Sequence, residues 1–389
     1  MNTQNTPVHI KLWHRDFWLL VVANLLLTMS VYILLPVLPQ WLMDTENLTP
    51  EETGLSMGAF GLGLYLLGSQ CSWLVQHYRR NVVCMWAVIA LALDVALLGY
   101  MDGLRSVFVE FWVILLHRLV LGATFGLAQM VLSSTLIIDT CESYQRTEAN
   151  YSASWFARFA LSLGPLAGLM TCRMAGFVEV LWGSIGCALL SVVFIKLVNF
   201  PFRSPDEDVH VASLDRFLLP EGHVLFVNLL LVSTVMGLLL TLPLTPLFYG
   251  LMMGGFLLAL LAQRFVFRDA ELKSEVVSGL ILLIAALLIL LSYPANLVAP
   301  VLVGLGIGIT SSRFLLFFIK LSRHCKRGTS QSTFFLGWET GIALGLALGY
   351  GLMYDQRDVL LYTSLALVAV SLLMYHFFTH AWFVRNKNR

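Results

Sequence analysis

The chain has 389 residues, of which 58% are hydrophobic and 12% are charged, and its formal net charge is +1. Apolar runs of about twenty residues, the length that crosses the hydrocarbon layer of a membrane, recur along the whole chain. A soluble domain cannot bury so much apolar surface. The composition therefore predicts a polytopic membrane protein, for which no nucleic-acid partner is expected.

Twelve predicted spans follow one another along the chain. We interpret them as helices, because separate strands would leave backbone groups unpaired in lipid and the alternating pattern of a barrel is absent. The first apolar run is interpreted as a retained span, since no signal-type cleavage sequence follows it. The first six spans are predicted at about 16–42, 53–76, 81–100, 107–138, 150–171 and 178–198, and the second six at about 222–242, 246–267, 274–293, 296–320, 331–354 and 357–382.

The longest polar segment, NFPFRSPDEDVHVASLDRFLLPEG, divides these spans into two sets of six. We predict two pseudo-symmetric six-helix bundles joined by a cytoplasmic central loop. The predicted boundaries are 1–198 for the N-terminal bundle, 199–221 for the loop and 222–389 for the C-terminal bundle.

A single offset of 181 positions relates residues of the two sets. It takes Arg146 to Arg327, Gly164 to Gly345, Gly168 to Gly349 and Arg158 to Glu339. Repeated halves are typical of secondary transporters, whose binding site lies near the membrane midplane between the repeats.

The basic residues predict the orientation of the chain. If the N-terminus is cytoplasmic, eighteen Lys and Arg residues fall in inner loops and ends, and three fall in outer loops. The outer segment DTENLTPEET is acidic and has no basic residue. By the positive-inside rule both termini are expected to face the cytoplasm, in a multi-pass protein of the plasma (inner) membrane.

Three short motifs resemble those of the major facilitator superfamily. RLVLGATFG resembles its RxxxG motif, LSLGPLAG is similar to a Gly-Pro motif associated with antiporters, and SWLVQHYRRN resembles its inner-loop motif GxLxDrxGRR. The residues that carry these matches are Arg118, Gly122, Gly164, Pro165, Gly168 and Arg80. The chain departs from the patterns at Ser72, Gln76 and Arg79 in the loop, and at Ala160 and Leu169 beside the Gly-Pro pair.

This resemblance covers nearly the whole chain and implies a twelve-helix fold that works by alternating access. It also implies that the fourth span lines a central cavity and that the fifth and eleventh spans form the interface between the halves. The acid of the inner-loop motif normally helps to hold one closed state through charge pairs. Gln76 cannot do so in the same way.

Charged residues within the predicted spans are few. A charge at the bilayer centre costs about 2.5–3.5 kcal/mol, and such residues usually face bundle interiors or wet cavities. Asp94 is predicted to be either a structural partner of a neighbouring span or a proton-titrating group. Arg118 begins a stripe with Gly122, Gly126 and Ser133, and keeps its charge. It could anchor an anion, stabilise a nearby carboxylate, or serve packing alone.

Arg158 and Glu339 are predicted to lie at similar depth on opposite halves. A carboxyl group that alternates between an apolar site and an arginine partner, Arg158 or Arg313, would bind and release a proton as the halves rock. Our hypothesis is that Glu339 carries the proton or couples it to substrate. The competing interpretation is a permanent ion pair that holds the bundle together.

Polar and small residues on other spans complete the predicted cavity. Asn24, Thr28 and Tyr32 recur at helical spacing, and Arg313 follows a Thr-Ser-Ser run. Hydroxyl groups in spans bond their own backbone more often than a ligand. Gly345 and Gly349 continue a small-residue face that we interpret as packing or sliding.

We therefore predict a proton-coupled exporter (antiporter) of a small organic or amphipathic compound, monomeric in the lipid bilayer. No cofactor and no enzymatic activity are expected. The alternative is an importer, proton-coupled or facilitative, of a small organic anion or sugar. An intramembrane lipid-modifying enzyme is less favoured, because His77 and His117 have no matching carboxylate spacing. A sensor is also less favoured, because it would need a soluble domain. No phosphate-binding loop of the GxxxxGK[ST] kind is present, so transport is expected to draw on an ion or substrate gradient.

Overall fold

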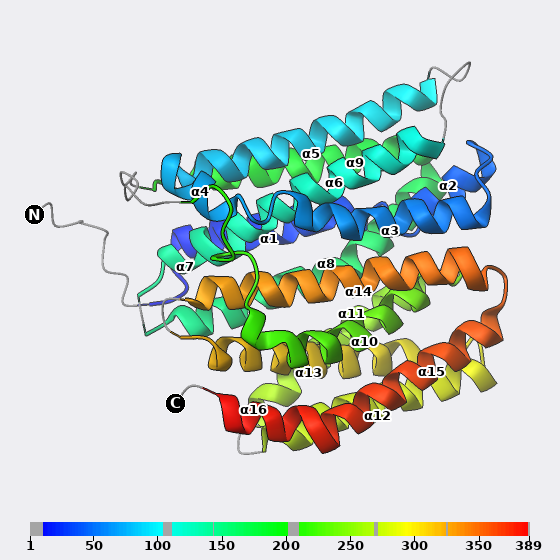
Figure 1. Cartoon of the computed structure of the whole chain (residues 1–389). Coiled ribbons are helices and arrows are strands. Elements are labelled where there is room, and N and C mark those ends of the chain that lie inside the picture. The colour runs from blue at the N-terminus through cyan, green and yellow to red at the C-terminus, as the bar shows by residue number, and fades with distance from the viewer. Residues whose placement is uncertain are drawn as a thin grey trace, which may run out of the picture.

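The computed structural model describes residues 11–103, 111–142, 144–200, 210–267, 271–323 and 326–387, and within them it contains helices and no strand. The first residues of the predicted span 107–138 and residues 201–209 of the predicted central loop lie outside these ranges. The long helices run side by side (Figure 1). Such a layer of parallel helices is the arrangement expected of a membrane bundle.

The helical segments match the twelve predicted spans one to one. In the first half they are α1 (Arg15–Tyr32) with α2 (Leu38–Asp44), α3 (Pro50–Leu66) with α4 (Cys71–His77), α5 (Arg80–Gly103), α6 (Phe111–Val131) with the π-helical η1 (Leu132–Leu136) and α7 (Ile137–Asp139), α8 (Arg146–Met174) and α9 (Phe177–Lys196). After the short η2 (Pro220–Gly222) come α10 (His223–Leu240), α11 (Pro246–Phe265), α12 (Leu272–Ser292), α13 (Val298–Leu321), α14 (Arg327–Met353), and α15 (Arg357–Met374) with the π-helical η4 (Tyr375–Thr379) and α16 (His380–Asn386).

Nine candidate spans within the described residues are long and apolar enough to cross a membrane. The three predicted spans not among them correspond to α3 with α4, to α8 and to α14. These helices carry more glycine, hydroxyl and amide residues than the others, and α8 and α14 hold Arg158 and Glu339. Their polar residues are tolerated because other helices surround them, as the packing between the two parts of the chain shows.

The helices form two groups that lie one above the other in Figure 1. The first group comprises α1–α9, in which α1 packs on α8 and α9 while α3 packs on α6. The second group comprises α10–α16, in which α10 packs on α14 while α11 packs on α13. The groups meet where α3 contacts α14 and where α8 contacts α11 and α13. The less apolar helices are therefore the ones at this junction.

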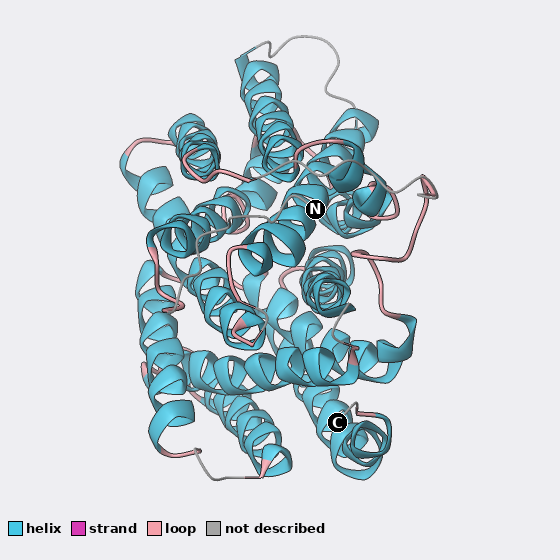
Figure 2. Cartoon of the chain, turned by 90° about the vertical axis from the view of Figure 1, so that its left-hand side faces the viewer, coloured by secondary structure: helices cyan, strands magenta, loops and turns pink. Residues whose placement is uncertain are grey.

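We call the end of the helices that carries Arg79, Arg80, Arg146 and Arg327 the basic end; it is on the left in Figure 1 and faces the viewer in Figure 2. Helix α1 begins and α16 finishes at this end. At the opposite end, α3 starts with a capping box. The Thr49 hydroxyl accepts from the Glu52 backbone N–H at 3.2 Å, and the Thr49 N–H donates to the Glu52 carboxylate at 2.9 Å.

Candidate functional site

A small cavity lies between the two helix groups, about halfway along the helices. Its volume is about 50 Å³, enough for a few water molecules in this state. The first group contributes α1, α6, η1 and α8, and the second contributes α14. The lining residues are Asn24, Tyr32, Gln129, Ser133, Ser154, Ala157, Arg158, Gln331, Phe334, Phe335, Trp338 and Glu339. We call this the central pocket.

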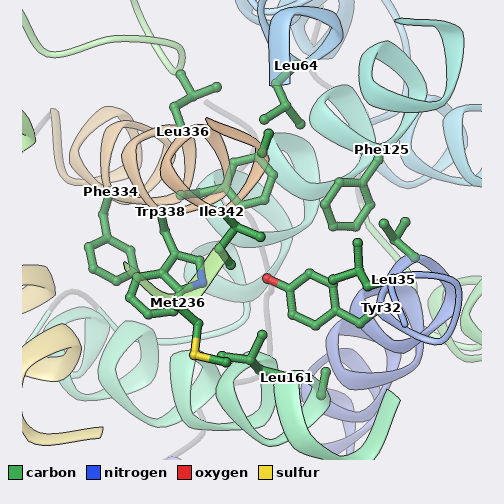
Figure 3. Close-up of a cluster of buried hydrophobic side chains, with 14 of the residues drawn as sticks. Tyr32, Leu35, Leu64, Phe125, Leu161, Met236, Phe334, Leu336, Trp338 and Ile342 are labelled. Carbon is green, nitrogen blue, oxygen red and sulfur yellow. The ribbon is translucent and has the colours of Figure 1, made fainter. Parts of the chain in front are cut away.

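Glu339 stands in the central pocket with a tyrosine of the opposite group as its partner. The Tyr32 hydroxyl donates a hydrogen bond of 2.5 Å to Oε1 of Glu339. Glu339 is only 3% exposed, so this donor replaces water that the carboxyl group would otherwise bind. Figure 3 shows the Tyr32 hydroxyl pointing toward the indole nitrogen of Trp338, the residue that precedes Glu339. The carboxyl group is thus held at the boundary between the two groups.

Arg158 reaches the same pocket from α8. Its Nε donates to the Ser311 hydroxyl at 2.7 Å, and its Nη1 donates to the Ser154 hydroxyl at 2.8 Å. The guanidinium group lies 4.9 Å from the ring centroid of Trp155, in cation–π range. Its Nη2 is buried without a hydrogen-bond partner among the described residues. No ion pair within the described residues joins Arg158 to an acid.

Arg158 and Glu339 occupy equivalent positions in their two helices, as the sequence predicts. Each lies twelve residues after the first residue of its helix, since α8 begins at Arg146 and α14 at Arg327. At 1.5 Å per residue this places both about 18 Å from the basic end. Both side chains line the central pocket. No ion pair within the described residues joins them, so a permanent bridge is absent from this state.

A chain of hydrogen bonds links the polar stripe of α1 to α6 and α8. The Asn24 amide donates to the carbonyl oxygen of Ala153 at 3.2 Å, and the Thr28 hydroxyl donates to the Asn24 carbonyl at 2.8 Å. Nε2 of Gln129 donates to Thr28 Oγ1 at 3.1 Å. Asn24 and Gln129 face the central pocket, whereas Thr28 is not among its lining residues. The polar stripe of α1 therefore lines part of the pocket and also joins α1 to α6 and α8 through hydrogen bonds.

Arg118 and Asp94 lie away from the central pocket, in a buried cluster of the first group. Asp94 Oδ1 is 3.0 Å from Nδ1 of His117, and both side chains are at least nine-tenths buried. Arg118 is 1% exposed and lies 5.0 Å from the ring centroid of Phe60. Sequence spacing offers no carboxylate to His117, and the structure places Asp94 beside it. Asp94 and His117 meet because α5 and α6 pack side by side, which sequence spacing cannot reveal.

Arg313 is also outside the central pocket. Its Nε donates to Oε2 of Glu275 at 2.5 Å, and Glu275 is 1% exposed. The pair joins α13 to α12 within the second group, so Arg313 is engaged with an acid at the start of the neighbouring helix. Glu275 stands one residue inside the predicted span 274–293, and its burial gave no signal in the sequence.

The predicted glycine motifs lie where helices come closest. A Cβ added at Gly122 would be 2.2 Å from the Phe60 carbonyl oxygen, and one at Gly164 would be 2.8 Å from Cβ of Tyr32. The other close contacts of this kind are Gly168 with Ile33, Gly345 with Thr234, and Gly349 with Thr241. Pro165 lies inside α8 between the two glycines of its motif. The Gly-Pro motif therefore packs directly against the end of α1 that supplies Tyr32.

At the basic end, the segment that follows residue 210 connects the two groups. Ser72 of α4 donates to Asp215 Oδ2 at 3.4 Å, and Thr329 of α14 donates to Asp215 Oδ1 at 3.1 Å. The Gln76 amide donates to Ser72 at 3.3 Å, and Arg80 pairs with Asp139. We call the chain Gln76–Ser72–Asp215–Thr329 the basic-end latch. Asp215 thus bonds a side chain of each helix group.

The two groups are close together at the basic end, whereas at the opposite end a hollow lies beside the contact between α3 and α14. Gly328 of α14 is close enough to η1 that an added Cβ would lie 2.5 Å from the Ser134 carbonyl oxygen, and Tyr151 donates to Gln263 between α8 and α11. At the opposite end, a hollow of about 400 Å³ separates α2 and the preceding Pro36 from α10, α14 and α15. It is lined by Asp44, Tyr350, Asp355 and Arg357 among others. This arrangement is open at the opposite end and closed at the basic end.

Sequence reasoning missed several residues of the central pocket. Gln129 lies between Gly126 and Ser133 on the predicted stripe of α6, so helical spacing could have identified it. Gln331, Phe334, Phe335 and Trp338 precede Glu339 on α14 within two turns. Their orientation toward the pocket follows from how α14 packs against α3 and α10, and a single sequence gives no signal of that.

The chain was compared with known proteins by sequence and by structure. A family model described as Major Facilitator Superfamily matches residues 20–346. A sequence search of curated proteins finds no match. A bacterial homologue of the iron transporter ferroportin, in an outward-facing state, has a similar structure with a TM-score of 0.65 and 16% identity, over 94% of this chain and 100% of that chain.

Two further solved structures are similar. An auto-inhibited peptide transporter of the POT family matches with a TM-score of 0.68 and 11% identity, over 97% of this chain and 98% of that one. The human organic anion transporter MFSD10 matches with a TM-score of 0.65 and 16% identity, over 92% and 98% respectively. At such low identity these similarities show the fold. The family model covers most of the chain and agrees with the twelve-helix architecture, so the protein belongs to the Major Facilitator Superfamily of membrane transporters.

Proposed function

We propose that the protein is a proton-coupled secondary transporter that exports a small organic or amphipathic compound by alternating access. The observation that carries the proposal is the central pocket, where Glu339 and Arg158 from opposite helix groups face a common space without bonding each other. A buried carboxyl group in such a place can exchange a proton when its surroundings change. The Gly-Pro motif of α8, which resembles that of antiporters, supports the export direction.

Alternating access requires the two helix groups to move as units. We propose that 1–198 and 222–389 act as two bundles that rock about the central pocket, joined by a cytoplasmic loop at 199–221. The basic end is proposed to face the cytoplasm, because α1 starts there, α16 finishes there and the basic residues gather there. The protein is then a monomer of the plasma (inner) membrane, exposing the hollow near Asp44 and Asp355 to the outside.

Each predicted site residue has a place in this proposal. Glu339 binds the proton, with Tyr32 as its hydrogen-bond partner, while Arg158 and Asn24 contact the substrate. The Asp94 and Arg118 cluster is proposed to respond to protons within the first bundle, because α6 connects it to Gln129 and the pocket. Arg313 and Arg80 are proposed to hold their bundles together.

Uptake of a small organic anion is the second candidate, and the unbalanced charge of Arg158 favours it. The two directions differ in which side of the membrane loads the substrate. Purified protein reconstituted in vesicles, given a panel of compounds with and without a pH gradient, would distinguish them. Substrate that moves in the direction opposite to the protons indicates an antiporter and supports export. Substrate that moves in the same direction as the protons indicates a symporter and supports uptake.

The decisive test of proton coupling is Glu339→Gln, which removes the titrating group with little change of shape. We expect transport driven by the pH gradient to fall to background, while exchange of substrate across the vesicle membrane persists. The control is Glu179→Gln, because Glu179 is exposed near the start of α9 and outside the pocket. Unchanged gradient-driven transport in Glu339→Gln would rule out this role.

A further inference from the structure

The polar atoms left unbonded in the central pocket define what a ligand must offer. Arg158 contributes a donor, because every nitrogen of a guanidinium group carries hydrogen and none accepts. Two of its nitrogens are engaged by uncharged hydroxyls, and Nη2 is free. A buried cation without a bonded counter-ion is costly, and carboxylates and phosphates are the anions whose geometry matches a guanidinium. The ligand is therefore expected to bring an anionic group to Arg158.

The α1–α6 hydrogen-bond chain fixes two acceptors in the same wall. Ala153 presents a carbonyl oxygen, which can only accept, so Asn24 must turn its NH₂ group toward it and leave Oδ1 free. The Thr28 hydroxyl uses its hydrogen on the Asn24 carbonyl, so Gln129 must donate to Thr28 and leave Oε1 free. Both oxygens are buried and unbonded among the described residues. They require hydrogen-bond donors from the ligand.

The facing wall comes from α14, where three aromatic residues lie between Gln331 and Glu339, and Oε1 of Gln331 is a further buried acceptor without a bond among the described residues. Phe334 and Trp338 lie parallel, with ring centroids 6.5 Å apart and an interplanar angle of 15°, and Phe335 lines the pocket beside them. This wall offers packing area to a ligand and no positive charge. Arg158 is the only cation among the lining residues of the pocket as the structure describes it. One side of the pocket is thus a charged donor, another a pair of acceptors, and the third a hydrophobic surface.

We infer that the compound transported through this pocket is a small carboxylic acid that also carries a hydroxyl or amino donor beside an apolar group. Its carboxylate binds Arg158, its donor binds Asn24 and Gln129, and its apolar part packs on Phe334, Phe335 and Trp338. This inference rests on the proposed function and adds the class of substrate. A neutral or cationic compound would leave the Arg158 charge unbalanced, and an acid without donors would leave both amide oxygens unbonded.

The inference is tested by ligand-induced stabilisation of the full-length protein in detergent, because a ligand of the folded state raises the unfolding temperature. Mandelate carries all three features, its carboxamide lacks the charge, and phenylacetate lacks the hydroxyl. The same comparison is made for a panel of aliphatic and aromatic hydroxy and amino acids. We expect at least one acid of the panel to bind more than tenfold more tightly than either of its analogues. Equal binding of the neutral analogue, or no stabilisation by any acid, would overturn the inference.

Two substitutions locate the binding. Arg158→Gln should weaken the best acid by about 10- to 100-fold, as expected for loss of a hydrogen bond between charged groups, and Asn24→Leu should abolish the preference for the donor-bearing acid. The matched control is Asn228→Leu, which removes a buried amide of α10 that is bonded to Ser371 and outside the pocket. An acid that binds equally to Arg158→Gln occupies another site and refutes the assignment.

Vesicle transport separates this inference from the function on which it rests. Transport of a neutral or cationic compound that depends on Glu339 would leave the proton-coupled transporter in place and reject the acid class. If instead acids bind with the expected preference but no compound crosses the membrane, the pocket assignment stands and the transport proposal fails.

Discussion

Glu339 illustrates how a carboxyl group is accommodated within an apolar helix. Its partner, Tyr32, lies 307 positions earlier in the chain and reaches it only because α1 and α14 approach each other at the central pocket. The nearby Thr340 hydroxyl makes an analogous bond of 2.8 Å with the hydroxyl of Tyr65 from α3. Successive residues of α14 are thus bonded by tyrosines of two different helices of the first group. Only the first of these bonds reaches an ionisable group.

Tyr32→Phe tests the importance of that bond. The substitution keeps the ring and removes the donor to Glu339, and a hydrogen bond to a charged acceptor contributes about 1.5–3 kcal/mol. We expect the rate of gradient-driven transport to fall about tenfold or more, with the unfolding temperature little changed. Tyr65→Phe, which loses the bond to Thr340, should retain coupling to the pH gradient. Equal losses in both variants would assign the effect to packing.

The sequence predicts residues of the pocket where a repeat or a helical spacing marks them. Arg158 and Glu339 share an offset, and Asn24 and Tyr32 share a helix face, so the sequence alone identifies both pairs. Tyr32 could not be matched to Glu339, nor Asp94 to His117, because each contact depends on how two helices are rotated against each other. Burial of Glu275 beside Arg313 escaped prediction for the same reason.

At the scale of elements, α3 and α14 form a seam of small residues between the two helix groups. A Cβ added at Gly54 would lie 2.6 Å from the Gly351 nitrogen, and one at Gly61 would lie 2.7 Å from the Ala343 side chain. Small residues allow helix backbones to approach closely, and close approach maximises dispersion contacts where lipid provides no hydrophobic drive. The seam runs along α3 and the second half of α14, from Gly54 beside Gly351 to the Tyr65–Thr340 bond.

We expect Gly61→Leu to push α3 and α14 apart at this seam. Overpacking of a close contact costs about 1–3 kcal/mol, which is enough to change the balance between two conformations of a transporter. We expect the maximal transport rate to fall at least fivefold. The control is Gly186→Leu on α9, where an added Cβ meets no atom within 4 Å. Its transport should stay within twofold of the unaltered protein. A Gly61 variant that performs as well as the control would show that the seam does not need close contact.

The twelve spans were predictable because apolar length is a strong signal, whereas the pairing of helices was not. The candidate spans omit α8 and α14, which are less apolar, and α3, which has only 17 residues, and the structure shows that these three helices lie at the junction of the groups. A helix that is partly surrounded by other helices needs less apolar surface than one surrounded by lipid. Low hydropathy can therefore identify helices of the junction from the sequence, but it does not identify the helices against which they pack.

At the scale of the whole molecule, the basic-end latch holds the two groups together on one side while a hollow separates them on the other. Asp215 bonds Ser72 of the first group and Thr329 of the second, and the Arg216 backbone N–H also donates to Thr329 at 2.9 Å. Farther along the segment, the Leu219 N–H donates to Thr333 at 2.8 Å. The connecting segment after residue 210 therefore lies along the first turns of α14 and also links α14 to α4. Opening of the basic end would have to break the side-chain bonds first.

Asp215→Ala should loosen this end. Removal of a partner in a part-buried hydrogen-bond network costs about 1–3 kcal/mol, which corresponds to about a 5- to 150-fold greater population of the opened state. We expect faster hydrogen–deuterium exchange in 213–219 and in the first turns of α14. Asp358→Ala, which removes an exposed partner of Arg357 at the opposite end, is the control and should leave these segments unchanged. Unaltered exchange in Asp215→Ala would show that the backbone contacts alone close the basic end.

The equal depth of Arg158 and Glu339 on α8 and α14 has a consequence for the ancestry of the molecule. If the two halves descend from one duplicated unit, that unit placed the same residue on both sides of its pocket. A protein assembled from two first halves would bring two guanidinium groups to the pocket, and one assembled from two second halves would bring two carboxyl groups, which repel each other when both are ionised. Divergence at this single pair of positions has therefore made the halves non-interchangeable. We expect that neither half could be replaced by a copy of the other half.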